Sequence, residues 1–277
     1  MTTEIKITNP NKVLFPKSKI KKIDLINYYI EISKRMMPFV ENRLLAVIRC
    51  HKGNSKQECF FKKHPTTDKS MVEIFNLKGE KYFYLKDEIQ LIYQVQMGTI
   101  EFHPWGSSVK ANEKPNVMIF DLDPDENLSL THLRSATKKV KSVLDELNLT
   151  SFLKTSGGKG YHIVVPFSKT KSWKQFYEFS RQVATLIEQK WPDIFTTNLK
   201  KDKRNNKIFI DYLRNNRGST CVAPYSVRAR ENAPVSMPIS WSNLNKVSPN
   251  EVTIKNYKKY LNNSWKNFFN INQELNF

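Results

Sequence analysis

Residues 117–124 read Val-Met-Ile-Phe-Asp-Leu-Asp-Pro, and this stretch predicts the central strand of the fold. Because side chains alternate along a strand, Asp121 and Asp123 should share one face while Leu122 points into the core on the other. Two carboxylates this close repel, so in a partly buried site they need a cation between them, or one of them must be protonated. Two divalent ions that bind the attacking and leaving oxygens are a common use of such a pair in phosphoryl transfer.

A third acidic residue, Asp211, ends another apolar run, Ile208–Ile210. A carboxylate at the end of a buried strand costs free energy unless it binds a partner. Ligands that are all oxygen suit magnesium or manganese. We therefore predict a metal site made by Asp121, Asp123 and Asp211. The alternative, that they are ordinary strand-end or capping residues, remains open on this pattern alone.

The segment 155–162 reads Thr-Ser-Gly-Gly-Lys-Gly-Tyr-His between two expected strands. Its glycines would let backbone N–H groups approach a phosphate closely, and Ser156 and Lys159 would add a hydroxyl and a charge. His162 follows the loop on the next strand. Taken alone, the same residues are more typical of a tight hairpin than of a phosphate-binding loop.

Arginines gather after Asp211, with four of them in the 17 residues 214–230. Guanidinium groups match phosphate oxygens in a bidentate manner, so arginines beside a metal site would neutralise a triphosphate. A solvated basic loop is the alternative. The polar segment 198–207, also a predicted loop, is not expected to touch any ligand-binding residue.

The chain of 277 residues has 45 Lys and Arg against 26 Asp and Glu, a formal net charge of +19. Such an excess predicts a polyanionic partner, with nucleic acid ahead of an anionic membrane surface. A basic surface without a partner is the alternative. No run reaches the ~18 consecutive apolar residues of a membrane span, and the N-terminus lacks the apolar core of a signal peptide. We expect no membrane association and a cytoplasmic, nucleoid-associated protein.

Strand and helix patterns alternate along the chain and predict an α/β (α+β) fold. Helical periodicity or end signals occur at 22–37, 87–97 and 130–147, after a capping box at Ser172 and Gln175, and from a capping pattern at 248–251. A soft boundary is expected near residues 110–115.

Three cysteines, Cys50, Cys59 and Cys221, are an odd number without CxxC spacing. This pattern predicts neither a disulfide framework nor a zinc site. We expect buried thiols instead.

Together these motifs resemble the polymerase domain of bacterial ATP-dependent DNA ligase D, a member of the archaeo-eukaryotic primase superfamily. The resemblance covers about residues 7–265. The motifs that carry it, in the family's order, are Thr8–Pro16, Glu58–His64, Glu101–Gly106, Asp121–Pro124, Ser156–His162, Asp211–Asn215, Ala223–Arg230 and Pro238–Trp241. It implies a single domain over 1–277, with an N-terminal α/β module up to about 112 and a primase-like catalytic core with a mixed sheet over about 113–265.

The resemblance also implies roles for individual residues. Asp121, Asp123 and Asp211 would be catalytic and hold two metal ions, with manganese favoured and magnesium possible. The residues implied to bind the nucleotide are His103, Ser156, Lys159, His162, Arg214 and Arg228. Those implied to bind the 5′-phosphate of a downstream strand are Lys12 and Lys22, and those implied to stack on the template are Phe60 and Phe61. Outside the family, His103 would be a core or turn residue, the two lysines surface residues and the phenylalanines core residues.

The implied function is the addition of ribonucleotides or dNTPs to DNA 3′ ends, for gap filling and end extension in non-homologous end joining. The implied partners are DNA ends, gapped duplexes with a 5′-phosphate, NTPs, Ku and an ATP-dependent DNA ligase. Alternatives are a primase that starts chains de novo and a non-catalytic basic protein that binds DNA ends. A two-metal nuclease is weaker, because no residue that would position a hydrolytic water is evident.

Overall fold

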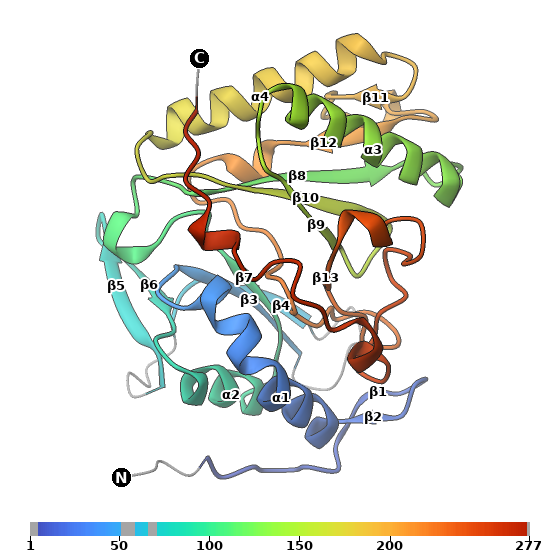
Figure 1. Ribbon diagram of the computed structural model, residues 1–277. Coiled ribbons are helices and arrows are strands. Elements are labelled where there is room, and N and C mark those ends of the chain that lie inside the picture. The colour runs from blue at the N-terminus through green and yellow to red at the C-terminus, as the bar shows by residue number, and fades with distance from the viewer. Residues whose placement is uncertain (1–4, 51–58, 66–70, 276–277) are drawn as a thin grey trace. The chain divides into compact units, whose positions relative to one another are not determined.

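The computed structural model describes residues 5–50, 59–65 and 71–275 (Figure 1). The chain forms two compact units, each made of segments that are not continuous in the sequence. The first unit comprises Met1–Lys110, Thr220–Ser236 and Val252–Lys259, and the second comprises Ala111–Ser219, Met237–Glu251 and Tyr260–Phe277. The chain first passes from one unit to the other after Lys110, and it crosses between them again at later positions.

The second unit is built on a six-stranded sheet with the order β11-β12-β8-β10-β9-β13. β11 and β12 are parallel and the other neighbours are antiparallel, so the sheet is mixed, as predicted. The predicted central strand is β8, which lies between β12 and β10. The strands are β8 Val117–Pro124, β9 Phe152–Thr155, β10 Tyr161–Pro166, β11 Phe195–Thr196, β12 Ile208–Asp211 and β13 Pro238–Ile239.

Two helices, α3 Leu130–Glu146 and α4 Trp173–Lys190, lie along one face of this sheet (Figure 1). α4 packs on both β8 and α3. Met118, Phe120 and Leu122, at alternate positions of β8, are fully buried. Because side chains alternate, the residues between them, including the aspartates, point to the opposite face.

The first unit contains a three-stranded sheet with the order β4-β3-β7 and the two hairpins β1-β2 and β5-β6. Helices α1 and α2 pack on each other and on β7. Tyr29 of α1 donates its hydroxyl to Ile100 O at 2.6 Å and meets the Phe102 ring edge-on. The elements are β1 Val13–Phe15, β2 Ile20–Lys21, α1 Lys22–Val40, β3 Leu45–Cys50, β4 Cys59–Lys62, β5 Glu73–Leu77, β6 Glu80–Tyr84, α2 Glu88–Gln96 and β7 Thr99–Pro104.

Short 3₁₀ turns lie between or after these helices and strands. They are η2 Val109–Ala111, η3 Lys201–Lys203, η4 Leu213–Asn215, η5 Trp241–Asn243, η6 Tyr257–Tyr260 and η7 Phe268–Asn270. A loop was expected over Thr196–Lys207. Thr196 belongs to β11, and the residues after it form a loop that contains η3.

Two local signals are confirmed. Ser172 accepts a hydrogen bond from Gln175 N, and the Gln175 side chain accepts one from Ser172 N, so the predicted capping box begins α4. Gly98 follows α2 with a φ of 91°, in the left-handed region where glycine is favoured at a helix end.

The helix predicted to begin at Ser248 is wrong. Ser248 N donates to the Glu251 carboxylate at 2.7 Å, as in a capping box, but residues 249–251 form only a turn. The chain then becomes extended, because Val252 O accepts from Val235 N and Thr253 bridges Pro234. β-branched residues favour extended backbone, and here these tertiary hydrogen bonds override the local signal.

The expectation of three thiols is also wrong. Cys50 and Cys59 are directly opposite on β3 and β4 and form a disulfide, with Cα atoms 4.2 Å apart. The spacing of the cysteines could not show this, because it depends on the strand register. Cys221 is buried, as expected.

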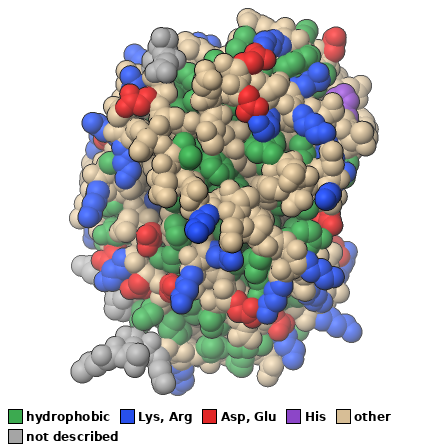
Figure 2. Space-filling model, in the orientation of Figure 1, with side chains coloured by type: hydrophobic (Ala, Val, Ile, Leu, Met, Phe, Trp, Pro, Cys, Tyr) green, Lys and Arg blue, Asp and Glu red, His purple; other side chains and the backbone are tan. Residues whose placement is uncertain are grey.

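No helix in the described ranges is long and apolar enough to cross a membrane. Lysine and arginine side chains are spread over the face shown in Figure 2, with acidic side chains among them. The excess of positive charge is therefore distributed over this face and does not form one patch on it.

Candidate active site

The strand register brings Asp121 between two other predicted site residues. Asp121 on β8 is directly opposite Asp211 on β12 and opposite His162 on β10. Opposite residues of antiparallel strands project from the same face, and Asp123, two positions further along β8, shares that face. The three aspartates therefore lie on the side of the sheet away from α3 and α4. Their role as metal ligands stays a prediction.

The pKa values of the three carboxyl groups differ because their neighbours differ. Burial raises the pKa of Asp121, but the hydrogen-bonded contact with His162 and the charges of Arg214 and Lys154 outweigh it and bring this pKa down to about 2. Burial, and then the charge of Asp121, raise the pKa of Asp123. Burial also raises the pKa of Asp211, against the opposing charge of Arg214. This cluster holds one firmly ionised carboxylate and two that a further cation would stabilise.

Arg214 supplies a cation shared by two of these carboxylates. Its Nε lies 3.0 Å from Asp211 Oδ2 and 3.9 Å from Asp121 Oδ2. The carboxylates of Asp121 and Asp211 therefore already lie beside one positive charge. The groups that they offer to a metal ion are all oxygen atoms, which suits magnesium or manganese. Within the described ranges, no three His, Cys, Asp or Glu side chains are gathered in an arrangement that could hold a metal ion. The chemistry of the donors nevertheless fits divalent ions.

His162 is held between Asp121 and a buried lysine. His162 Nε2 lies 3.2 Å from Asp121 Oδ1, and Lys154 Nζ lies 2.7 Å from His162 Nδ1. An ammonium group can only donate, so Nδ1 accepts and the ring proton is on Nε2, facing the aspartate. Lys154 is 1% exposed and opposite His162 in the sheet. The row Asp211, Asp121, His162 and Lys154 therefore crosses four neighbouring strands.

The glycine loop is a tight hairpin between β9 and β10. Ser156 Oγ accepts from Gly158 N at 3.0 Å and from Gly160 N at 3.2 Å, and Gly157 N donates to Pro249 O at 2.9 Å. The N–H groups of its three glycines thus have acceptors within the unit, which favours the hairpin over a backbone phosphate site. Lys159 is exposed and pairs with Glu126. Contacts of Ser156 and Lys159 with a nucleotide stay predictions.

In the first unit, two other predicted nucleotide-binding residues meet at Glu101. The carboxylate of Glu101, only 2% exposed, lies 2.8 Å from Arg228 Nε and 2.9 Å from His103 Nε2, and it accepts from Ala229 N at 2.7 Å. Burial raises the pKa of Glu101, but the hydrogen bond from His103 and the charge of Arg228 outweigh it and bring the pKa to about 2. His103 and Arg228 are therefore held by one buried carboxylate.

Backbone strain helps to place Arg228. Tyr225, three residues earlier, has a φ of 67°, which is unfavourable for a bulky residue. Tyr225 N donates to Ser236 O at 2.7 Å, and its carbonyl accepts from the Tyr28 hydroxyl at 2.7 Å. These bonds hold the turn from which Arg228 reaches Glu101.

Comparison with known proteins tests the resemblance seen in the motifs. Residues 21–268 match the family model described as the LigD primase-polymerase domain. The chain belongs to this family. The resemblance predicted from the sequence is thus confirmed, and so is the expected enzyme class, because a primase-polymerase is a nucleotidyltransferase.

Curated relatives of the LigD family include longer proteins. The chain is 34% identical over 243 residues to the multifunctional non-homologous end joining protein LigD of Pseudomonas aeruginosa, covering 86% of the chain and 29% of that protein. It is 29% identical to the bifunctional LigD protein of Bacillus subtilis, covering 86% of the chain and 39% of that protein. The chain therefore spans about a third of the length of these relatives.

A solved LigD structure has the same fold. The polymerase domain of Mycobacterium tuberculosis ligase D, determined in complex with DNA, superposes with a TM-score of 0.83. The match covers 91% of this chain and 92% of the other, at 24% sequence identity. The predicted primase-like fold is confirmed.

The two phenylalanines with an expected template role lie on opposite faces of β4. Phe60 is opposite Arg49 and Phe61 is opposite Ile48 in the register, and both rings are almost half exposed. Phe61 meets the His103 ring edge-on, with centroids 5.9 Å apart. Of the two, Phe61 therefore shares a face with a predicted nucleotide-binding residue of this LigD domain. Template stacking stays a prediction, and Glu58 of the same motif lies outside the described residues.

The two lysines with an expected 5′-phosphate role are adjacent, because the β1-β2 hairpin folds them together. Lys22 N donates to Lys12 O at 2.8 Å. Lys22 is 8% exposed, and its Nζ donates to Thr8 O at 2.8 Å. Burial, and then the charge of Lys12, lower the pKa of Lys22. The fold thus brings together two lysines that are ten positions apart in the sequence, and binding of a 5′-phosphate by them stays a prediction.

Three residues in these clusters were not singled out from the sequence. Glu101 precedes His103 by two strand positions, and Lys154 is a lysine inside an apolar strand, so each had a visible signal. Arg204 had none. It lies in the polar segment that was expected to touch no ligand-binding residue, yet its Nη1 is 3.8 Å from Asp123 Oδ2 and its guanidinium stacks on the Phe209 ring. That expectation was wrong because β12, which follows the segment, pairs with β8 and brings Arg204 next to Asp123.

Gly160 should be intolerant of any side chain. A Cβ there would lie 1.8 Å from the carbonyl oxygen of Leu122 on β8, so the backbone next to the aspartates would have to shift. We expect Gly160→Ala to lower the free energy of unfolding by about 3 kcal/mol, at the upper end of the usual cost of an overpacked site. Urea unfolding followed by tryptophan fluorescence measures this.

Gly79→Ala is the matched control for that substitution. Gly79 has a φ of 86° and nothing within 4 Å of its Cβ position, so only backbone strain of about 1 kcal/mol is expected. Equal losses for the two variants would contradict the predicted clash with Leu122.

Proposed function

We propose that this chain adds ribonucleotides or dNTPs to the 3′ ends of broken or gapped DNA with the help of two divalent metal ions. The observation that carries the proposal is the convergence of Asp121, Asp123 and Asp211 on one face of the sheet, beside His162. Membership of the LigD primase-polymerase family favours divalent ions as cofactors, and we infer manganese ahead of magnesium.

The residues have separable roles in this proposal. Asp121, Asp123 and Asp211 would hold the ions, which lower the pKa of the attacking 3′-hydroxyl and neutralise the leaving pyrophosphate. Arg214, about half exposed, would turn toward phosphate oxygens. His162 would keep its Nε2 proton directed at the reacting centre, because Lys154 occupies Nδ1. His103, Arg228, Ser156 and Lys159 would contact the nucleotide.

The substrate and partners are inferred from charge and from the relatives. A net charge of +19 favours DNA as the bound polyanion, with affinity that falls steeply as salt rises. The relatives are named as non-homologous end joining proteins, and the solved polymerase domain is in complex with DNA. We therefore propose a role in end joining with Ku and an ATP-dependent DNA ligase. A cytoplasmic location at the nucleoid would follow from this role.

A primer-extension assay tests the proposal. The purified chain is incubated with a labelled gapped duplex that bears a 5′-phosphate, with each NTP or dNTP, and with manganese, magnesium or EDTA. We expect metal-dependent extension that is fastest with manganese. Binding of the duplex without extension under every condition would overturn the enzymatic role. Products from a single-stranded template without a primer would indicate de novo priming instead.

Lys22→Gln should weaken recognition of a downstream 5′-phosphate. Removing one charge from the site shared with Lys12 should raise the dissociation constant for a 5′-phosphorylated gap about tenfold. Affinity for the same gap with a 5′-hydroxyl should hardly change. Lys21→Gln, the adjacent exposed lysine, is the matched control. Fluorescence anisotropy on both duplexes measures the effect, and equal losses on both would contradict phosphate recognition.

A further inference from the structure

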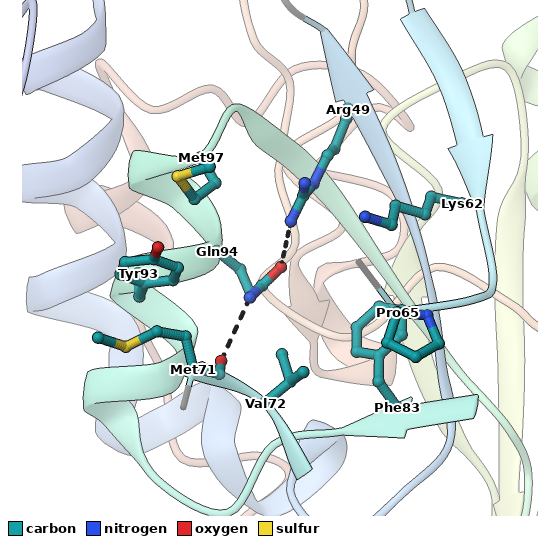
Figure 3. A pocket seen from close by; sticks show the side chains of 9 residues that line it. All are labelled: Arg49, Lys62, Pro65, Met71, Val72, Phe83, Tyr93, Gln94 and Met97. Atoms are coloured by element: carbon teal, nitrogen blue, oxygen red, sulfur yellow. Dashed lines mark hydrogen bonds between the residues drawn. The ribbon is translucent and has the colours of Figure 1, made fainter. Parts of the chain in front are cut away.

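A cavity of about 40 Å³ lies in the first unit between β3, β4 and α2. One water needs roughly 10–15 Å³ by this measure, so the space suits one small polyatomic group. Two cationic side chains, Arg49 and Lys62, point into it from β3 and β4 (Figure 3). The rest of the lining is largely apolar and aromatic: Pro65, Met71, Val72, Phe83, Tyr93, Gln94 and Met97.

Arg49 is buried against neutral partners. It is 6% exposed, and it donates to Gln94 Oε1 at 2.6 Å and to Thr99 Oγ1 at 3.3 Å. The Gln94 amide is oriented by its own bond to Met71 O at 3.3 Å. A guanidinium has five N–H donors, so these two bonds leave donor capacity directed at the cavity.

Lys62 adds a second positive charge. Among the described residues, no acidic side chain lines the cavity or forms a recorded ion pair with Arg49 or Lys62. Burial, and then the charge of Arg49, lower the pKa of Lys62 to about 8. Burial lowers the pKa of Arg49 as well. Two like charges in an apolar recess cost free energy, which an anion between them would recover.

We propose that this cavity is a binding site for one phosphate-sized oxyanion, held by Arg49 and Lys62. A guanidinium beside an ammonium provides forked and single donors to a tetrahedral oxyanion. The apolar walls strengthen those contacts because they exclude water. The two cations suit one small oxyanion, which is either free phosphate or the terminal phosphate of a nucleic-acid strand.

The cavity is distinct from the sites described above. Lys62 is opposite Val47, whereas the preceding residue, Phe61, is opposite Ile48 and meets His103. Successive residues of a strand point to opposite faces. The oxyanion site therefore lies on the reverse of the face that carries Phe61 and His103.

Methionine methyl groups give a local readout. Met71 and Met97 line the cavity, whereas Met118 and Met237 are buried in the second unit. The full chain is labelled with ¹³C-methyl methionine, assigned by Met→Leu variants, and titrated with inorganic phosphate. We expect saturable shifts of the Met71 and Met97 signals while those of Met118 and Met237 stay in place.

Lys62→Gln and Lys63→Gln form a matched pair of variants. Lys63 is the next residue, is exposed and lies over the Phe61 ring. We expect Lys62→Gln to raise the phosphate dissociation constant about tenfold and Lys63→Gln to leave it unchanged. Absent shifts at Met71 and Met97, or equal affinities of the two variants, would overturn the site. Unchanged signals of Met36, buried in α1 of the first unit, and of Met118 and Met237 establish that each variant is folded.

A second arm identifies the source of the oxyanion. Duplexes with a 5′-phosphate or a 5′-hydroxyl are titrated into the Lys22→Gln chain, in which the other phosphate site is weakened. Shifts of Met71 and Met97 with the phosphorylated duplex alone would support a strand terminus as the ligand. Shifts with inorganic phosphate alone would support a free anion. In either case, phosphate should slow acetylation of Lys62 at pH 8 but not that of Lys63, as measured by mass spectrometry.

Discussion

Asp121→Asn is expected to slow nucleotide addition by at least about a thousandfold. Asp121 lies between Asp211 and His162, so the substitution removes the carboxylate common to the predicted metal site and to the histidine contact. Asparagine keeps the shape of the side chain but supplies no negative charge to bind divalent ions. Single-turnover extension of a gapped duplex in manganese measures the rate.

The structure indicates which properties should survive this change. DNA binding should persist, because it depends on basic side chains elsewhere, and so should the fold, because Asp121 faces away from the α3 and α4 core. Asp145→Asn, at an exposed position of α3, is the control and should keep full activity. An Asp121→Asn protein that binds DNA and extends the primer at the normal rate would remove the basis of the proposed mechanism.

Glu101→Gln is expected to destabilise the first unit by about 3 kcal/mol. The substitution leaves Arg228, 16% exposed, without its counter-charge, and it replaces a carboxylate oxygen that faces two donors. Removing one partner of a buried ion pair costs more than the pair itself contributes. Glu80→Gln, an exposed carboxylate of β6, should change the unfolding free energy by less than about 0.5 kcal/mol.

The pH dependence of unfolding tests the same interaction. The folded pKa of Glu101, about 2, lies below its ordinary value of 4.5. A depressed pKa gives stability that is fully present above the unfolded value and is lost as the pH falls toward the folded one. The difference in unfolding free energy between the wild-type and Glu101→Gln chains should therefore shrink between about pH 4.5 and pH 2. A constant difference across this range would contradict the assignment.

The strands and helices that were predicted correctly are those whose signals lie between neighbouring residues. The apolar run at 117–120 predicts a strand, and the box at Ser172 and Gln175 pairs two local groups; both predictions were confirmed. The predicted helix at 248–251 failed although its capping bond forms, because Val252 and Thr253 bond to a distant segment. The disulfide between Cys50 and Cys59 was missed because it depends on how β4 pairs with β3.

The sequence by itself determined the family and the enzyme class, because motifs are properties of neighbouring positions. It also predicted the three acidic residues as a metal site, and that role stays a prediction. Tertiary structure alone decided which groups surround them. Strand register placed Asp211 and His162 beside Asp121, returned Arg204 to Asp123, and set Arg49 and Lys62 in one cavity. Electrostatic interactions depend on distance and burial, not on separation along the chain. The direction in which each carboxyl pKa shifts therefore follows only from the folded structure.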